Sequence, residues 1–196
     1  MECELLPEKI GRQRIIMSQN KVILDNTEEL ISKKRAALAQ DLFFIIPIDV
    51  NTELPRAQHK NQILGIELDI CPKMFKSRAF SIKGTVKIQE VSAAIGYATT
   101  LIYWLSKYSS IELVYPVRPR SSEPLLYSKV GKVLYNAMVF PLYPTRGIDR
   151  PRFEYAIKLL FANLYQIQMA LGKEEYYPNS ILLNINTILI SLGVVI

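Results

Sequence analysis

Residues 140–172, FPLYPTRGIDRPRFEYAIKLLFANLYQIQMALG, constrain the fold of this chain more than any other segment. In their second half, apolar residues recur at steps of three and four, the period of an α-helix. One apolar stripe comprises Phe153, Ile157, Leu160, Leu164, Ile167 and Leu171, and a second comprises Tyr155, Leu159, Ala162 and Met169. A helix with two apolar stripes has to be covered on two sides. The segment therefore predicts a central core helix without catalytic residues.

The ends of this helix carry their own signals. Asp149 can cap the first turn, and Pro151 suits a helix start, where backbone amides lack acceptors anyway. Glu154 precedes Lys158 by four residues, which favours an ion pair along the helix. Gly172 can adopt the left-handed conformation that ends a helix.

A second long helix is predicted for residues 8–42, which contain no proline. Its apolar residues repeat every seven positions in two adjacent columns: Ile16, Ile23, Leu30 and Ala37, and Met17, Leu24, Ile31 and Leu38. Gln19, Asn26 and Lys33 stand where further seam residues are expected, and polar seam positions specify partner and register. We expect the end of a coiled coil with a different chain, with its interface at Ile16, Ile23, Leu24, Leu30, Ile31 and Leu38. The alternative is that this helix packs on its own domain.

The period changes near residue 42, which divides the chain into a docking helix (1–42) and a globular domain (43–196). Strands are predicted at 63–70, 112–117 and 132–142, with helices at 90–109 and from about Asn179. Asn179 can cap that last helix. Because short strands and helices alternate, we predict an α/β or α+β layered domain.

The net charge of +6 permits binding to an acidic surface. Residues 80–88 have apolar side chains at period two, as on one face of a strand. The basic side chains nearby are Lys73, Lys76, Arg78 and Lys83. These would line a solvated face, or would contact anionic lipid head groups or an acidic partner. The sequence has no nucleic-acid-binding motif, so no nucleic acid partner is expected.

The residue types needed for catalysis or metal binding are sparse. Cys3, Cys71 and His59 are too few for a zinc cluster, and two distant cysteines favour a reducing compartment. No nucleophile with a base and no phosphate-binding loop can be assembled, so we expect neither an enzyme nor a cofactor or metal. The charged N-terminus does not resemble a signal peptide, and polar residues interrupt the apolar run 181–196.

Three segments carry a family resemblance: AIGYATTLIYWLSKY (94–108), IELVYPVRPRSS (111–122) and FPLYPTRGIDRPRFEYAIKLLFANLYQI (140–167). Together with FFIIPID (43–49), they resemble the C-terminal domain of the UVRAG family, whose fungal members are vacuolar-sorting proteins. The signature residues of this resemblance are Phe140, Pro141, Leu142, Tyr143, Pro144, Phe153 and Tyr155. The sequence is less similar to the autophagy-specific paralogue of these proteins. Arg118, Pro119 and Arg120, and the apolar insert 125–138, depart from the family pattern.

The resemblance implies a β-sheet and α-helix repeat domain of the Beclin-related type, preceded by the C-terminal end of a coiled coil. It implies a non-catalytic scaffold subunit of the class III phosphatidylinositol 3-kinase complex, with roles in vacuolar protein sorting and autophagy-related trafficking. The implied partners are a Beclin-type subunit, the lipid kinase and its pseudokinase-like regulatory subunit. The implied location is cytoplasmic, peripheral on endosomal or vacuolar membranes.

Overall fold

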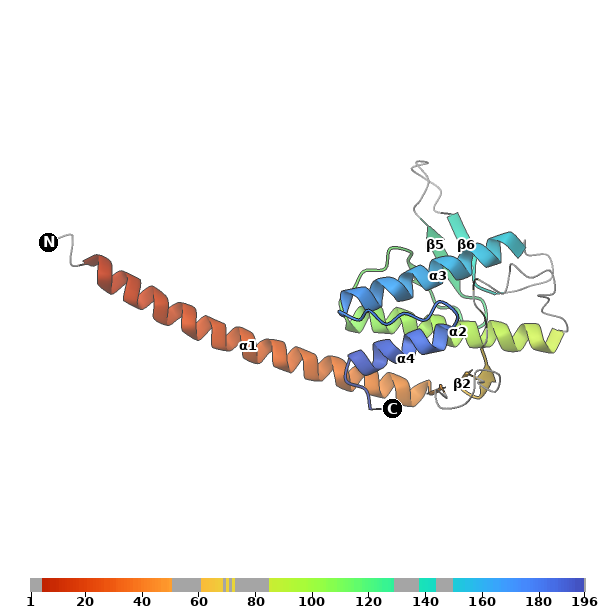
Figure 1. Ribbon diagram of the computed structural model, residues 1–196, viewed down its shortest axis with the longest axis horizontal. Helices are drawn as coiled ribbons and strands as arrows, with labels where there is room; N and C mark the ends of the chain where they lie inside the picture. The colour runs from red at the N-terminus through yellow and green to blue at the C-terminus, as the bar shows by residue number, and fades with distance from the viewer. Residues whose placement is uncertain are drawn as a thin grey trace.

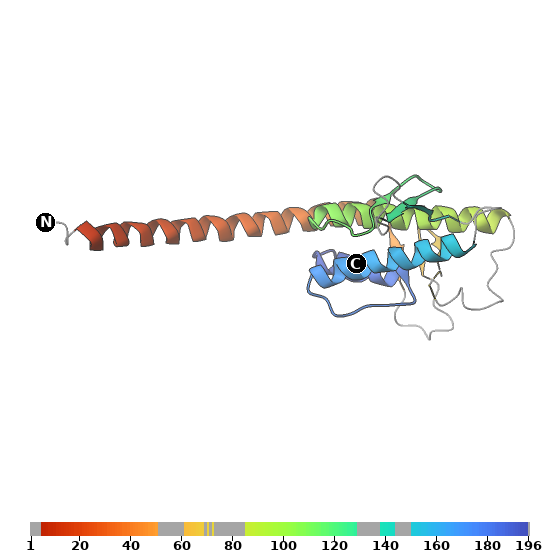
Figure 2. The same cartoon turned by 90° about the horizontal axis from the view of Figure 1, so that it is seen from above.

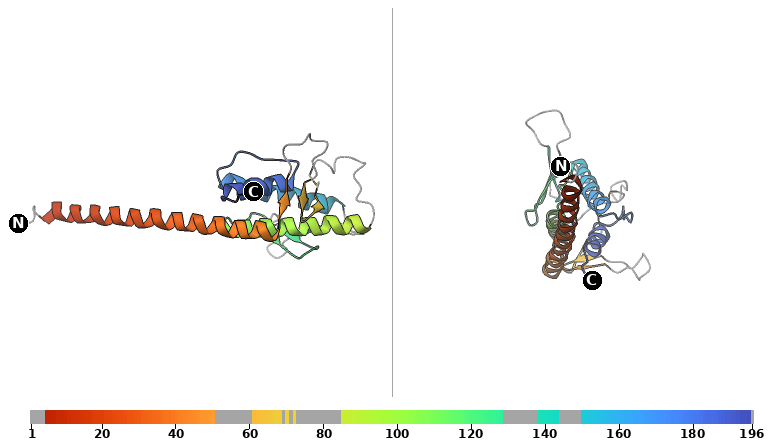
Figure 3. Two further views of the ribbon diagram at one scale, coloured as in Figure 1. Left: turned by 90° about the horizontal axis from the view of Figure 1, so that it is seen from below. Right: turned by 90° about the vertical axis from the view of Figure 1, so that its left-hand side faces the viewer.

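The computed structural model describes residues 5–50, 61–68, 70, 72, 85–128, 138–143 and 150–195, with the backbone alone at 5–11, 85–87 and 150. Within these residues the fold is mixed α+β, with four helices and two antiparallel three-stranded sheets. Helix α1 projects from the other elements as a long arm, and the other three helices pack together with the sheets (Figure 1). Helices α1 and α2 lie in one layer and α3 and α4 in a second (Figures 2 and 3).

Helix α1 (Leu5–Ile45) is longer than the predicted 8–42 and includes the first three residues of FFIIPID. Every side chain from residue 12 to residue 34 is exposed. The end of α1 and the residue that follows it join the core through Ala39, Leu42 and Ile46, all of which are buried. The last turns of α1 therefore pack on the globular body, while the earlier turns contact none of it.

Helix α2 (Thr85–Tyr108) is the central helix, with Ile95, Ala98, Leu101, Ile102 and Leu105 fully buried. It begins five residues before the predicted start at 90, so Val86 and Ile88 are helical and their assignment to a strand was wrong. Residues 73–84 lie outside the described residues, and with them Lys73, Lys76, Arg78 and Lys83.

Helix α3 (Arg150–Ala170) buries its first predicted stripe, from Phe153 to Ile167. Of the second stripe only Leu159 is buried, so the prediction of cover on two sides was wrong. The reason is position: α3 lies on the surface and turns one face to α4 and strand β6, so the opposite face meets solvent. Gly172, with φ +70°, follows the helix in the predicted left-handed conformation. The Lys158 Nζ to Glu154 Oε1 distance is 2.8 Å, which confirms that ion pair.

The first sheet has the order β1-β2-β3, from strands β1 (Ile48–Asp49), β2 (Gln62–Ile63) and β3 (Ile66–Glu67). The predicted single strand 63–70 is instead a hairpin between β2 and β3. Leu64 (φ 50°) and Gly65 (φ 74°) form its two-residue turn. Two consecutive left-handed residues reverse the chain with the twist of the flanking strands, which breaks a continuous strand.

The second sheet has the order β4-β5-β6, from strands β4 (Val117–Arg118), β5 (Leu125–Ser128) and β6 (Met138–Pro141). Strand β5 was not predicted, and the predicted strand 112–117 exists only at Val117. Side chains of α3 bind the backbone of 112–115 instead of a neighbouring strand. Asn163 accepts from the Tyr115 N–H (3.1 Å) and donates to the Tyr115 carbonyl (2.6 Å). Gln166 accepts from the Val114 N–H (3.0 Å) and donates to the Glu112 carbonyl (2.7 Å).

Helix α4 (Ile181–Ser191) begins close to its predicted start, but its cap is Ser180 and not Asn179. The Ser180 Oγ accepts a hydrogen bond from the Leu183 N–H at 3.2 Å. The side-chain amide of the buried Asn184 accepts a hydrogen bond from the Tyr177 N–H (2.9 Å) and donates one to the Tyr177 carbonyl (2.6 Å). This pairing positions the loop that leads into the cap.

Candidate protein interface along helix α1

The two apolar columns predicted in the N-terminal segment lie along one face of α1. Their large side chains between Ile16 and Leu38 have exposed fractions from 43% to 72%. Folded proteins rarely leave so many large apolar side chains along one face open to water without a binding function. The structure thus places the predicted interface residues together on one continuous helix, on a face that the chain itself leaves uncovered. They are Ile16, Ile23, Leu24, Leu30, Ile31 and Leu38.

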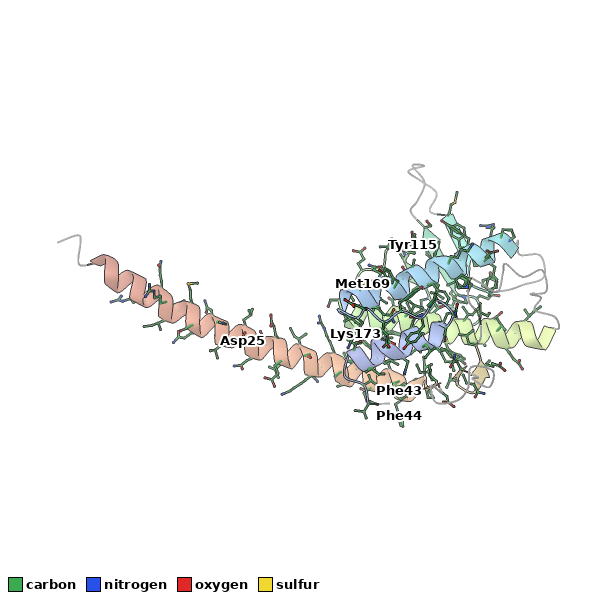
Figure 4. All side chains as sticks on the ribbon, viewed as in Figure 1. Asp25, Phe43, Phe44, Tyr115, Met169 and Lys173 are labelled. Atoms are coloured by element: carbon green, nitrogen blue, oxygen red, sulfur yellow. The ribbon has the colours of Figure 1, made fainter. Side chains whose placement is uncertain are left out.

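Both columns continue one heptad further than the sequence analysis traced them. Phe44 and Ile45 follow Ala37 and Leu38 by seven residues, and their side chains are 85% and 68% exposed. Figure 4 shows Phe44 pointing away from the globular body. The sequence signal was present, since the seven-residue spacing persists, but the apolar run FFIIPID masked it. We call the ten residues of these columns the α1 stripe: Ile16, Met17, Ile23, Leu24, Leu30, Ile31, Ala37, Leu38, Phe44 and Ile45.

The end of α1 is fixed to the body on both sides. The Arg35 Nη2 donates to the Ser110 Oγ at 3.0 Å, beside the end of α2. The Gln40 side-chain amide accepts from the Val195 N–H (3.0 Å) and donates to the Val195 carbonyl (3.5 Å), beside the end of α4. These contacts and the buried Ala39 hold the direction in which the arm leaves the body. The stripe is therefore presented in a defined orientation.

The signature residues of 140–155 that the structure describes lie where β6 meets α3. Phe140, Leu142 and Phe153 are buried, and the exposed Tyr155 ring packs on the Phe140 ring at a centroid distance of 5.1 Å. Pro141 and Tyr143 are half-buried, and Pro144 lies outside the described residues. The Arg152 Nη2 donates to the Val139 carbonyl at 3.0 Å. This segment attaches β6 to α3.

A smaller aromatic contact lies at the other end of α3. The Tyr165 and Tyr176 rings meet edge to face at 5.2 Å. Burial raises the pKa of the Tyr176 hydroxyl above its usual 10.0, and the nearby Tyr165 raises this pKa further. Exposed Met169 and Lys173 lie near this end of α3 (Figure 4).

The described part of the chain contains no group of three or more His, Cys, Asp and Glu side chains placed to hold a metal ion. None of the helices that the structure describes has the length and hydrophobicity needed to cross a bilayer.

Comparison with known proteins agrees with the resemblance seen in the sequence. No protein-family model matches the chain. Over 171 residues the chain is 25% identical to the mouse UV radiation resistance-associated protein, an alignment that covers 86% of this chain and 21% of that protein. This distant similarity supports membership of the UVRAG family. It spans about a fifth of the length of that relative.

Proposed function

We propose that the chain is a non-catalytic scaffold subunit of a class III phosphatidylinositol 3-kinase complex, and that it pairs with a Beclin-type subunit. The observation that carries the proposal is the α1 stripe, whose apolar side chains repeat every seven residues and stay exposed from Ile16 to Ile45. Apolar seams of this period are typical of coiled coils. The distant relationship to the UV radiation resistance-associated protein supports the choice of complex.

In this proposal, residues 1–42 form the end of the coiled coil and residues 43–196 form a Beclin-related domain. Since α1 continues to Ile45 and one face of its last turns is buried on the body, movement of the partner helix would be transmitted directly to that domain. The lipid kinase and its pseudokinase-like subunit would complete the assembly. The complex would act peripherally at endosomal or vacuolar membranes in protein sorting and autophagy-related trafficking.

The test is co-expression of this chain with the coiled coil and C-terminal domain of a Beclin-type protein, followed by mass determination of the purified species. We expect a 1:1 complex. Leu30→Asp should weaken it by at least about 100-fold, because an unpaired charge in a buried seam costs roughly 3–5 kcal/mol.

The matched control is Ser32→Asp. Ser32 is also exposed on α1, but two residues of helix place it about 200° around the axis from Leu30. The same charge there should leave the complex intact.

A monomer that does not bind the Beclin-type protein would refute the scaffold proposal. If that monomer also bound anionic vesicles in a salt-sensitive way, the alternative of a membrane-surface module using Lys73, Lys76, Arg78 and Lys83 would replace it. Pairing within the complex of the autophagy-specific paralogue is the other alternative.

A further inference from the structure

The centre of the α1 stripe is polar. An α-helix turns by about 100° per residue, so residues three and four positions away lie on either side of a given residue. By this geometry one column runs between the two apolar columns of the stripe: Gln13, Asn20, Thr27, Lys34 and Asp41. All five side chains are exposed. In a coiled coil this central row would face the partner helix.

Two members of this row, Lys34 and Asp41, carry opposite charges one heptad apart. Neither makes an ion pair or a side-chain hydrogen bond with any residue that the structure describes. The column of Gln19, Asn26 and Lys33, which the sequence analysis placed in the seam, instead lies at the edge of the stripe. There the Lys33 Nζ is 2.6 Å from Glu29 Oε1. Among the described residues, Lys34 and Asp41 therefore have no partner, and a helix that faces the central row could pair with them.

A second copy of this chain is a poor partner. In a parallel pair, equal positions of the central row meet, so Lys34 would face Lys34 and Asp41 would face Asp41. Like charges within a desolvated seam are strongly unfavourable. In an antiparallel pair, Lys34 of each copy can face Asp41 of the other. In that register residue 45 of one copy lies opposite residue 30 of the other, so the two α1 helices overlap only at residues 30–45. That pair would leave the apolar residues from Ile16 to Leu24 exposed to water.

A parallel helix with complementary charges avoids both problems. It can cover the stripe from Ile16 to Ile45, because Phe44 and Ile45 remain exposed beside the body. We propose that Lys34 and Asp41 select the partner of α1, which is a parallel helix of a different chain with a carboxylate facing Lys34 and a basic side chain facing Asp41. The inference rests on the proposed function, since it takes the stripe to be a coiled-coil seam.

The test needs no natural partner. A full-length variant with both charges exchanged, Lys34→Glu/Asp41→Lys, presents the required charges to the wild-type chain at the same positions. Each protein alone and their equimolar mixture are analysed by sedimentation equilibrium, with circular dichroism as a check that the helices are retained. We expect the mixture to dimerise with a dissociation constant at least about tenfold lower than that of either protein alone, and we expect added salt to reduce this difference.

The matched control exchanges a charge pair at the edge of the stripe, in the variant Glu29→Lys/Lys33→Glu. That variant keeps the ion pair within its own helix, so its mixture with the wild-type chain should gain nothing. A charge-exchanged mixture that pairs no more tightly than the wild-type chain alone would overturn the inference. If the mixture pairs but the Beclin-type protein does not bind the wild-type chain, the proposed function fails and the charge selection stands. If the Beclin-type protein binds and the mixture pairs no more tightly, the proposed function stands and the charge selection fails.

Discussion

Gly96→Ala should destabilise the chain, although alanine is the better helix former. Gly96 lies within α2, where the turn between β4 and β5 passes directly over it. A Cβ atom at this position would be 1.7 Å from the Ser121 carbonyl oxygen and 2.7 Å from its carbonyl carbon. Ordinary van der Waals contact begins at 3.4 Å, so the turn would have to move by about 1.7 Å. The obstacle is backbone, and Ser121 already has a left-handed φ of 44°.

The balance of two terms sets the size of the effect. Replacing glycine by alanine inside a helix favours folding by about 1 kcal/mol. Overpacking of a well-packed site costs about 1–3 kcal/mol and sometimes more, and a displacement of this size belongs at the upper end. We expect a net loss of about 2 kcal/mol in the free energy of unfolding, and a Tm lower by roughly 4–8 °C for a chain of this length.

Thermal and urea unfolding of the wild-type chain and the variant would measure this loss. Gly65→Ala is the comparison, because no atom lies within 4 Å of its added Cβ, and only the φ of +74° opposes the substitution. That variant should lose about 1 kcal/mol through backbone strain alone. A Gly96→Ala variant as stable as the wild-type chain would show that the β4–β5 turn does not rest on α2, and would refute the reasoning.

Three further predictions concern separate parts of the chain. Asn163→Ala should lower the free energy of unfolding by about 2 kcal/mol in urea titrations, because it leaves the Tyr115 backbone groups without partners; an unchanged midpoint would contradict this. Phe44→Ser and Ile45→Ser should weaken binding to the Beclin-type protein in titration calorimetry while leaving the Tm nearly unchanged, because both side chains are exposed in the isolated chain; unaltered affinity would show that the partner helix ends earlier. Burial raises the pKa of Tyr176 above 10.0, so the unfolded chain loses this proton first, and stability should fall as the pH rises through 10. The Tyr176→Phe variant should lose less stability than the wild-type chain over that range, and equal slopes for the two proteins would count against this.

The long helices could be predicted because their signals are local and repeated. Residues 8–42 carry six seven-residue spacings in two columns, and residues 153–171 carry a complete helical stripe, so periodicity identified both α1 and α3. The left-handed Gly172 after α3 and the Glu154–Lys158 ion pair could be predicted for the same reason, because each depends on residues within about one helical turn. The mixed α+β class followed from the change of period along the chain.

The short strands were harder to predict, because two to four residues carry too little pattern. Strand β5 pairs with β4 on one side and β6 on the other, and this pairing is not visible in the four residues of β5 themselves. The segment 112–116 has strand-like composition, yet side chains more than forty residues away, Asn163 and Gln166, satisfy the backbone of 112–115. Long-range hydrogen bonds of this kind leave no periodic trace in the sequence.

The sequence by itself determined that α1 carries an apolar, seven-residue repeat with a polar row inside it, because helix geometry converts spacing directly into a face. Only the tertiary structure decided which faces stay open. Burial of Ala39, Leu42 and Ile46 fixes the end of α1 on the body and leaves Phe44 and Ile45 in water, so the stripe continues along the body. Likewise α2 is the central helix because it packs against α1, α4 and strands of both sheets, whereas α3 packs against α4 and one sheet. Packing of this kind is a property of the whole fold.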